Sequence, residues 1–274
     1  MSIARRLGRQ GASIIKAQGG DIVAPKAFNR AQAVQQEKAA LYAQAGVITT
    51  PGYLRLEVSL TGTTNLVAFQ VRDAQGGSQH VTERRLKVSD TFTIMSGAFY
   101  IGKAAVTAPA TVPTNLQYAT QSLHTFANPQ VFTGGSAAVN LQSLYNSYLS
   151  VRVDSTVFID SMPMLNFYRV ATSQQGVGSS AANNVPIQAD EWPLSMYGNR
   201  DWTPTIELNG LANTEININL PTSVNLVAGA NTYENVAVLY LNGFLNQGGA
   251  SVQQSVQRAL KSGGRLGEFD EDFD

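Results

Sequence analysis

Carboxylate and aromatic side chains gather in one stretch of the sequence, between residues 190 and 202. The members are Asp190, Glu191, Trp192, Tyr197, Asp201 and Trp202. Two carboxylates can act as general acid and base on a glycosidic bond, and aromatic rings stack on sugar faces, so this pattern suits a carbohydrate cleft. It also suits an aromatic-anchored loop that covers the end of a β-sandwich. We favour the loop and predict no catalytic residues and no enzyme activity.

Other residues that could support chemistry are sparse. His80 and His124 are the only histidines. Each stands in a polar, loop-like context without a second ligand at metal spacing, so we expect both to be solvated and predict no metal site. Neither a phosphate-binding glycine motif nor a nucleophile-elbow motif occurs, and we predict no cofactor. The chain has no cysteine, which excludes disulfides and thiolate chemistry.

Charge is scarce and unevenly placed in a chain whose formal net charge is zero. Only 14% of the residues are charged, against roughly 25% in typical soluble domains. A polar but weakly charged surface suits a protein whose faces are covered by neighbouring subunits, because charge keeps free monomers apart. Residues 1–30 are basic and residues 268–274 are acidic, so the two ends are complementary.

The basic end predicts an amphipathic helix over residues 3–16. Ile3, Leu7 and Ile14 share one arc of this helix. The opposite arc carries four cations: Arg5, Arg6, Arg9 and Lys16. The helix could lie on lipid headgroups or packaged nucleic acid, or its apolar arc could dock on a neighbouring subunit. A second helix is predicted over residues 26–45. No stretch of the sequence approaches the ~20 consecutive apolar residues that a membrane-spanning helix needs.

The remaining pattern is that of β-strands. The strongest, Tyr233 to Gln247, is apolar on both faces and predicts a central strand. Other strands are expected over residues 53–60, 65–72, 84–88, 91–102 with a bend or bulge at Gly97, 148–153, 156–160, 164–171, 205–208 and 215–220. Asp154 and Ser155 predict a hairpin turn, and residues 137–145 and 252–260 predict short helices. Roughly eight to ten strands are typical of an all-β sandwich or barrel.

Two regions have little pattern. Residues 103–135 predict a surface insertion or hidden short strands, and residues 172–203 predict a second loop-rich insertion. In the tail, the alternate carboxylates at 270, 272 and 274 begin like a calcium loop. The turn glycine and the closing glutamate of such a loop are missing, so docking of the tail on a basic neighbour is favoured over calcium binding.

Four segments resemble a known family. They are TPGYLRLEVSL, LKVSDTFTIMSGAFYIG, LYNSYLSVRV and ENVAVLYLNGFLNQ, joined by long loops rich in proline and threonine. The resemblance is to the jelly-roll major capsid proteins of tailless icosahedral, membrane-containing bacteriophages, the corticovirus-like group. It implies that Arg5, Arg6, Arg9 and Lys16 face the internal membrane or the genome. It also implies that the tail contacts a neighbouring subunit through Phe269, Asp270, Asp272, Phe273 and Asp274.

The resemblance and the pattern together divide the chain into three parts. We expect a basic amphipathic helical arm at 1–46, a jelly-roll β-sandwich at 47–248, and a short helix with an acidic tail at 249–274. Many relatives carry two jelly rolls of about eight strands each. This chain has enough strands for one jelly roll with long insertions, and two jelly rolls remain the alternative.

The predicted function is that of a self-assembling capsid subunit of an icosahedral bacteriophage. Its partners would be copies of itself, other virion proteins, and an internal lipid membrane or packaged nucleic acid reached by the arm. It would reside in the host cytoplasm before assembly and then in the virion. The alternative is a carbohydrate-binding or phage fibre receptor-binding module that uses Trp192, Tyr197 and Trp202, and a glycosidase ranks third.

Overall fold

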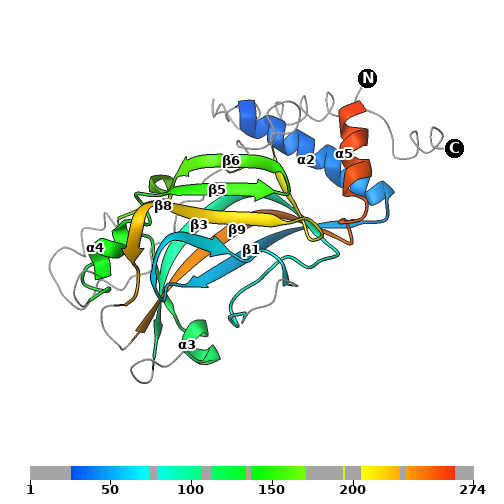
Figure 1. Ribbon diagram of the computed structural model, residues 1–274. Helices are drawn as coiled ribbons and strands as arrows, with labels where there is room; N and C mark the ends of the chain where they lie inside the picture. The colour runs from blue at the N-terminus through cyan, green and yellow to red at the C-terminus, as the bar shows by residue number, and fades with distance from the viewer. Residues whose placement is uncertain are drawn as a thin grey trace, which may run out of the picture.

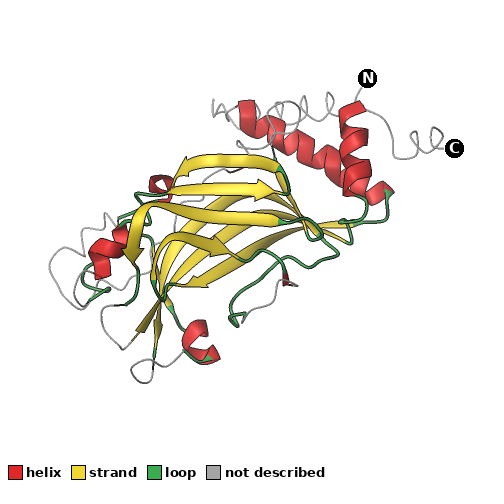
Figure 2. Cartoon of the chain, in the orientation of Figure 1, coloured by secondary structure: helices red, strands yellow, loops and turns green. Residues whose placement is uncertain are grey.

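The computed structural model describes residues 26–73, 79–106, 113–133, 137–170, 194, 205–228 and 233–262. Its body consists of two antiparallel β-sheets packed face to face, with helices at the ends (Figures 1 and 2). The all-β sandwich predicted from the sequence is therefore confirmed. None of the described helices is long and apolar enough to cross a membrane.

The two sheets contain five and four strands. The first sheet has the order β1-β9-β3-β4, with β7 also paired to β3. Its strands are β1 (Ile48–Ser59), β3 (Thr91–Ala105), β4 (Ser122–His124), β7 (Ile206–Asn209) and β9 (Tyr233–Gln247). The second sheet has the order β2-β8-β5-β6. Its strands are β2 (Thr63–Phe69), β5 (Tyr148–Val153), β6 (Thr156–Pro163) and β8 (Thr214–Asn225).

Short helices lie around the two sheets. They are α2 (Lys26–Gln44), α3 (Asn115–Ala119), α4 (Ala137–Gln142), the 3-10 helix η2 (Met164–Phe167) and α5 (Gln253–Ser262). α3 and β4 fall within residues 103–135, so this weakly patterned region does contain a hidden short strand, which pairs with β3. The helices expected near residues 26–45, 137–145 and 252–260 correspond to α2, α4 and α5.

β9 is the central strand of the first sheet, paired with β1 on one side and β3 on the other. Leu239 and Leu241 face the second sheet and are buried in the main core. Val236 and Val238, on the opposite face of β9, are also buried, in a cluster with Tyr118 of α3. Burial on both faces explains the unbroken apolar run that predicts a central strand.

The main core fills the space between the sheets. The first sheet contributes Leu54, Leu56, Phe92, Ile94, Phe99 and Ile101. The second sheet contributes Val67, Phe69, Leu149, Val151, Ile216 and Ile218. Within each strand these residues mostly recur at every second position, because alternate side chains of a strand point to the same face.

β3 contains a bulge at Met95, close to the bend or bulge predicted at Gly97. Its pairing with β9 skips Met95, so the inward-facing residues of β3 change from even to odd numbers along the strand. Gly97 itself is regularly paired. Opposite the bulge lies Gly243, where a Cβ would stand 1.9 Å from the carbonyl oxygen of Thr93. The close approach of the two backbones therefore requires glycine at 243, not at 97.

Residues 84–88 do not form the predicted strand. They make two isolated bridges, one antiparallel from Arg84 to Arg55 of β1 and one parallel from Leu86 to Arg72. The segment crosses from the edge of the first sheet toward the second, so it cannot pair continuously with either. Its backbone hydrogen bonds, such as Arg84 N to Arg55 O at 2.8 Å, nevertheless cover polar groups at the exposed edge of β1.

The hairpin predicted around Asp154 is confirmed, but the strand predicted after it is not. β5 and β6 pair antiparallel, and Asp154 in their turn has a φ of 51°. Beyond β6, residues 164–167 form η2 in place of the strand expected over 164–171. Met164 and Phe167 both reach the main core. Residues three apart share a face of a helical turn and point to opposite faces of a strand, so the helical turn is the conformation that buries both.

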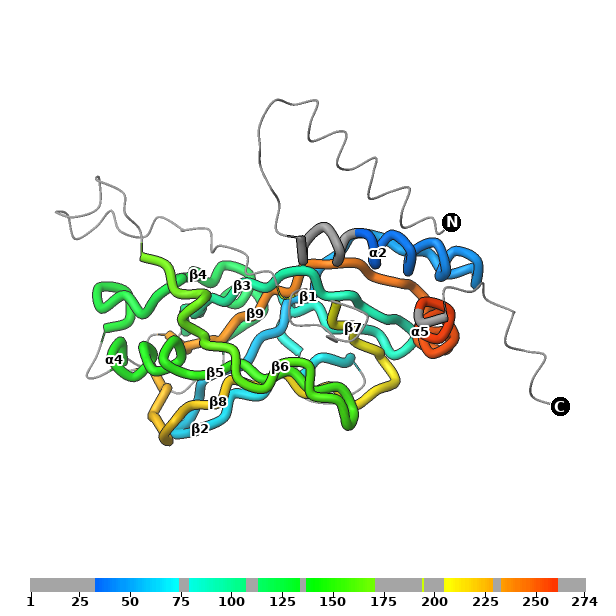
Figure 3. The backbone as a smooth tube through the Cα atoms, turned by 90° about the horizontal axis from the view of Figure 1, so that it is seen from above, coloured from blue at the N-terminus to red at the C-terminus, as the bar shows by residue number. Residues whose placement is uncertain are grey.

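α2 and α5 pack together at one end of the sandwich (Figures 1 and 3). Leu41 and Tyr42 of α2 form a small buried cluster with Val256 and Ala259 of α5. The apolar residues of α2 are thus used for packing on another helix. The described part of the chain therefore includes a helix that is docked on the β-sandwich.

A buried ion pair also fastens α2 to the first sheet. Lys38 Nζ donates to Glu207 Oε2 of β7 at 2.8 Å, and Tyr42 OH donates to Glu207 Oε1 at 2.6 Å. Only 2% and 3% of the Lys38 and Glu207 side chains are exposed. Burial alone would raise the pKa of Glu207, but the charge of Lys38 and these hydrogen bonds outweigh it and hold the pKa below its ordinary value.

Candidate functional site

The site residues predicted from the sequence lie outside the described residues. They are Arg5, Arg6, Arg9 and Lys16 of the arm, Asp190, Glu191, Trp192, Tyr197, Asp201 and Trp202, and Phe269, Asp270, Asp272, Phe273 and Asp274 of the tail. Their arrangement therefore stays a prediction. Within the aromatic stretch it describes Leu194, which is buried in the main core and packs over Gly97. A buried leucine at this position agrees with a loop anchored on the sandwich.

Three tyrosines form a row across the outer face of the first sheet. The ring centroids of Tyr53 on β1 and Tyr240 on β9 are 6.0 Å apart, and those of Tyr240 and Tyr100 on β3 are 5.8 Å apart. Tyr53 is 42% exposed, and the other two are half-buried. We call these residues the tyrosine row. Partly exposed tyrosines combine a rigid apolar ring with a hydroxyl, which is why they are common in binding surfaces.

Two arginines stack on the tyrosine row. The guanidinium of Arg55 lies 5.3 Å from the centre of the Tyr240 ring, and its Nη1 donates to the Tyr240 hydroxyl at 2.9 Å. The guanidinium of Arg84 lies 5.0 Å from the centre of the Tyr53 ring. Both contacts are of the cation–π type. Arg55 is also ion-paired with Glu57, so Arg84 supplies the positive charge that remains at the β1 edge of the first sheet.

Glu57 of β1 organises a polar cluster beside the tyrosine row. His80 Nδ1 lies 2.9 Å from Glu57 Oε2, and because a carboxylate only accepts, Nδ1 is the donor. Thr82 Oγ1 donates to Glu57 Oε1 at 2.7 Å. Burial would raise the pKa of Glu57, but the hydrogen bonds from His80 and Thr82 and the charge of Arg55 lower it below its ordinary value. The cluster fastens residues 80–82 to β1.

Both histidines are partly buried, so the prediction that they are solvated is wrong. The His80 side chain is 12% exposed and stacks on the Tyr118 ring with centroids 3.9 Å apart. His124 of β4 packs edge-on against Phe132. Burial, with a smaller contribution from the charge of Lys103, lowers the pKa of His124 to about 4. The polar neighbours in sequence suggest exposure, whereas residues distant in sequence cover both rings.

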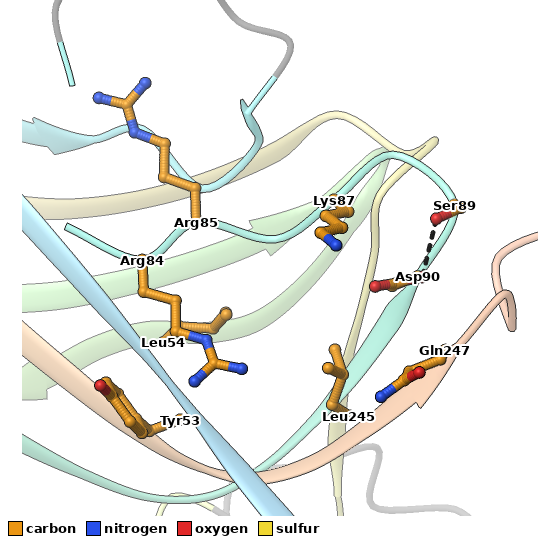
Figure 4. A pocket seen from close by; sticks show the side chains of 9 residues that line it. All are labelled: Tyr53, Leu54, Arg84, Arg85, Lys87, Ser89, Asp90, Leu245 and Gln247. Carbon is orange, nitrogen blue, oxygen red and sulfur yellow. Dashed lines mark hydrogen bonds between the residues drawn. The ribbon is translucent and has the colours of Figure 1, made fainter. Parts of the chain in front are cut away.

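A pocket of about 260 Å³ opens next to Tyr53 and Arg84 (Figure 4). Its lining residues are Tyr53, Leu54, Arg84, Arg85, Lys87, Ser89, Asp90, Leu245 and Gln247. Figure 4 shows Arg84 pointing into the space beside Tyr53, while Arg85 points away from it. Arg85 is paired with Glu83 at 2.8 Å. We call this the β1 edge pocket.

Asp90 is the acidic residue of the β1 edge pocket and is already hydrogen-bonded. Its Oδ1 accepts from Ser89 Oγ at 2.8 Å and from the backbone N of Gly248 at 2.9 Å. These bonds fasten the loop before β3 to the end of β9. Asp90 is 6% exposed, so its main role in the pocket is to hold the wall, and the cations remain available for a ligand.

Sequence reasoning missed the β1 edge pocket because it assigned residues 84–88 to a strand. The signal was the charge pattern of Arg84, Arg85 and Lys87, three cations within four residues of a chain with few charges. On a strand they would alternate between faces. In the crossing segment of the structure, Arg84 and Lys87 instead line one pocket with Gln247, which is far away in the sequence.

The tyrosine row and the β1 edge pocket are suited to binding. Within the described residues, no group of three or more histidine, cysteine, aspartate or glutamate side chains is placed to hold a metal ion. What the tyrosine row and the β1 edge pocket offer is aromatic surface, the guanidinium group of Arg84 and the ammonium group of Lys87, which suit an anionic or aromatic ligand. The charge of Arg55 is already paired with Glu57. Comparisons with models of protein families, with curated proteins and with solved structures find no match. The fold and site define a β-sandwich with a cationic surface pocket.

Proposed function

We propose that the sandwich is a single jelly roll and that the protein is a self-assembling capsid subunit of an icosahedral bacteriophage. A jelly roll has eight strands and can be pictured as a long antiparallel ribbon rolled into two sheets. In such a ribbon the first strand pairs with the last, the second with the next to last, and so on inward. If β4 is set aside as an addition, the four pairs required are β1·β9, β2·β8, β3·β7 and β5·β6.

All four of these pairings occur in the sandwich, and they are the observation that carries the proposal. The pairs alternate between the sheets, with β1·β9 and β3·β7 in the first and β2·β8 and β5·β6 in the second. Rolling the ribbon adds the contacts β9·β3 and β8·β5, which are also present. One jelly roll uses every named strand except β4, so the described strands favour one jelly roll over two.

The outer face of the second sheet supports a role in assembly. Cross-strand neighbours on this face include Leu66, Asn219 and Tyr148, where Leu66 is 45% and Tyr148 is 46% exposed. The next row contains Asn217 and Ser150. The row after that is charged, with Arg152 opposite Glu215. The uncharged polar and apolar part of the face, from Leu66 to Ser150, is suited to contact another subunit, because charged residues are depleted at the centres of protein interfaces.

In the proposed subunit the ends of the chain make contacts beyond the jelly roll. The basic arm, with Arg5, Arg6, Arg9 and Lys16, faces the interior membrane or genome, and the acidic tail contacts a neighbouring copy. The protein acts by association with itself and other virion proteins, in the virion, with no chemistry of its own. This part of the proposal rests on the charge of the two ends and on the resemblance of the sequence to capsid proteins.

Two deletions test the proposal. Removing residues 1–20 or residues 264–274 should reduce the yield of assembled particles, measured by light scattering and negative-stain microscopy. The far-UV circular dichroism of the β-sandwich should be unchanged. Undiminished particle yield after both deletions would contradict the proposed roles of the two ends.

The second candidate function is a carbohydrate-binding or phage fibre module. The exposed ring of Tyr53 beside a polar pocket favours it, because such rings stack on sugars. This candidate predicts a small soluble oligomer whose binding to a glycan array is lost in the variants Tyr53→Ala and Trp202→Ala. An oligomer that binds no glycan and forms shells would exclude it.

A further inference from the structure

The β1 edge pocket carries an excess of positive charge. Arg84 and Lys87 line it, against the single carboxylate of Asp90. Among the described residues, neither Arg84 nor Lys87 has a carboxylate within ion-pair distance. Arg85, the third cation of the lining, is neutralised by Glu83. The pocket therefore presents two cations whose charge no described acidic side chain neutralises directly.

The walls of the pocket are shaped for an aromatic side chain next to an acidic one. The Tyr53 ring and Leu245 give apolar surface on either side of the Arg84 guanidinium (Figure 4). Gln247 adds an amide that can donate and accept. The volume of about 260 Å³ lies below the roughly 300 Å³ at which pockets for drug-sized ligands begin. One or two side chains of a peptide would fill it.

The chain itself contains a segment with the complementary chemistry. Residues 268–274 read Glu-Phe-Asp-Glu-Asp-Phe-Asp, so two phenylalanines stand among five acidic residues. In an extended peptide Glu271 would point to the same side as Phe269 and Phe273, and Asp270 and Asp272 to the other, so carboxylates lie on both sides. Such a peptide could place a phenyl ring against Tyr53 and a carboxylate against Arg84 and Lys87 at the same time.

We propose that the β1 edge pocket binds the acidic C-terminal segment 268–274 of a second copy of this chain. The inference rests on the proposed assembly function and names the surface that receives the tail. α5 begins near the pocket, because the backbone N of Ala250 donates to Ser89 O at 3.0 Å. Its ten residues then run about 15 Å to Ser262. From there, residues 263–274 can extend about 40 Å, far enough to reach an adjacent copy.

A peptide titration tests the pocket independently of assembly. The probe is a fluorescein-labelled peptide with the sequence of residues 263–274, followed by fluorescence anisotropy. The target is the full-length chain with E268Q/D270N/E271Q/D272N/D274N, so that its own tail has lost the carboxylates with which it would compete. We expect R84E/K87E in this background to weaken peptide affinity about tenfold or more, because two attractions become repulsions. The matched control R152E, an exposed arginine on the second sheet, should change affinity less than twofold.

A disulfide test shows which copy supplies the tail. Because the chain has no cysteine of its own, single-cysteine variants of the full-length protein report one contact each. K87C on tagged chains and D272C on untagged chains are mixed under mild oxidation. We expect the mixed disulfide to exceed that of the control pair R152C and D272C about tenfold, and to decline at raised salt because screening weakens the charge contacts.

The outcomes separate this inference from the proposed function. Equal peptide binding by the R84E/K87E and R152E chains, or a mixed disulfide no stronger than the control, would overturn the inference. A further variant carries both K87C and D272C on one chain. If its disulfide formed only within single chains, the tail would occupy its own pocket, and this result would also overturn the inference. If the R84E/K87E chain formed particles as well as the unmodified chain, the inference would be wrong, but the proposed function would not be contradicted. Peptide binding without particles under any condition would contradict the proposed function instead.

Discussion

Removal of Lys38 should destabilise the whole β-sandwich and not only α2. In the variant Lys38→Met, Glu207 would remain buried without its ion-pair partner, and removing one member of a buried pair costs about 3–5 kcal/mol. Glu207 would keep the hydrogen bond from Tyr42, so we expect the lower end, about 3 kcal/mol. In Glu207→Gln the amide oxygen can still accept from Lys38 or Tyr42, and Thr205 stays 3.3 Å from Lys38. The buried ammonium nevertheless loses its counter-charge, so we expect about 4 kcal/mol.

The double variant Lys38→Met/Glu207→Gln isolates the interaction. It removes both charges, so its loss of stability should be smaller than the sum of the two single losses by at least about 2 kcal/mol. The assay is urea unfolding at neutral pH, followed by circular dichroism, with the free energy of unfolding extrapolated to water. The control Lys87→Met removes an exposed lysine and should change the free energy by less than about 0.5 kcal/mol.

Two results would contradict this prediction. If either single variant lost less than about 1 kcal/mol, the ion pair would not hold α2 to the sheet, and α2 would behave as an independent arm. If the single losses simply added in the double variant, the two side chains would not interact. Lowering the pH should also destabilise the protein. The pKa of Glu207 is lower in the folded state than in the unfolded state, so its ionised form stabilises the fold at pH values above the unfolded pKa. This stabilisation is lost as the pH falls through the folded pKa.

Three further predictions use the same unfolding assay. Gly243→Ala should cost more than about 3 kcal/mol of unfolding free energy, because the new Cβ would collide with a backbone carbonyl. The control is Gly52→Ala on β1, directly opposite Gly243. Its Cβ would make only ordinary contacts, so it should cost less than about 1 kcal/mol. Glu57→Gln should cost about 2–3 kcal/mol by leaving its donors unmatched. Between pH 6.5 and pH 4 the unmodified chain should lose about 1–2 kcal/mol of unfolding free energy, because His124 takes up its proton in the unfolded state first. The variant His124→Asn should not show this loss. An unchanged pH profile in His124→Asn would refute the last of these.

The strands that follow a simple period were predictable from the sequence. β9 is apolar on both faces because β1, β3 and the second sheet surround it, and such burial leaves an unmistakable run of apolar residues. The β5–β6 hairpin was predictable because Asp154 tolerates the positive φ of its turn. In both cases the determining interactions are local, or repeat regularly along the chain.

The misassigned elements depend on contacts between residues distant in sequence. Residues 84–88 alternate like a strand, yet they bridge two sheets and so pair with neither for long. The bulge in β3 was visible in principle, since the core residues change from even to odd numbers between Ile94 and Phe99. Its position at Met95 is determined by Gly243, on another strand. Similarly, the pocket exists only because the chain brings Gln247 beside Arg84 and Lys87.

The particle size of the purified full-length protein tests the central proposal most directly. It should be measured by light scattering and negative-stain microscopy at low and at raised salt. The account predicts closed shells or regular clusters that loosen as salt screens the contacts between the charged ends. A stable monomer or small oligomer under every condition, with glycan binding, would contradict the capsid proposal and favour a binding module.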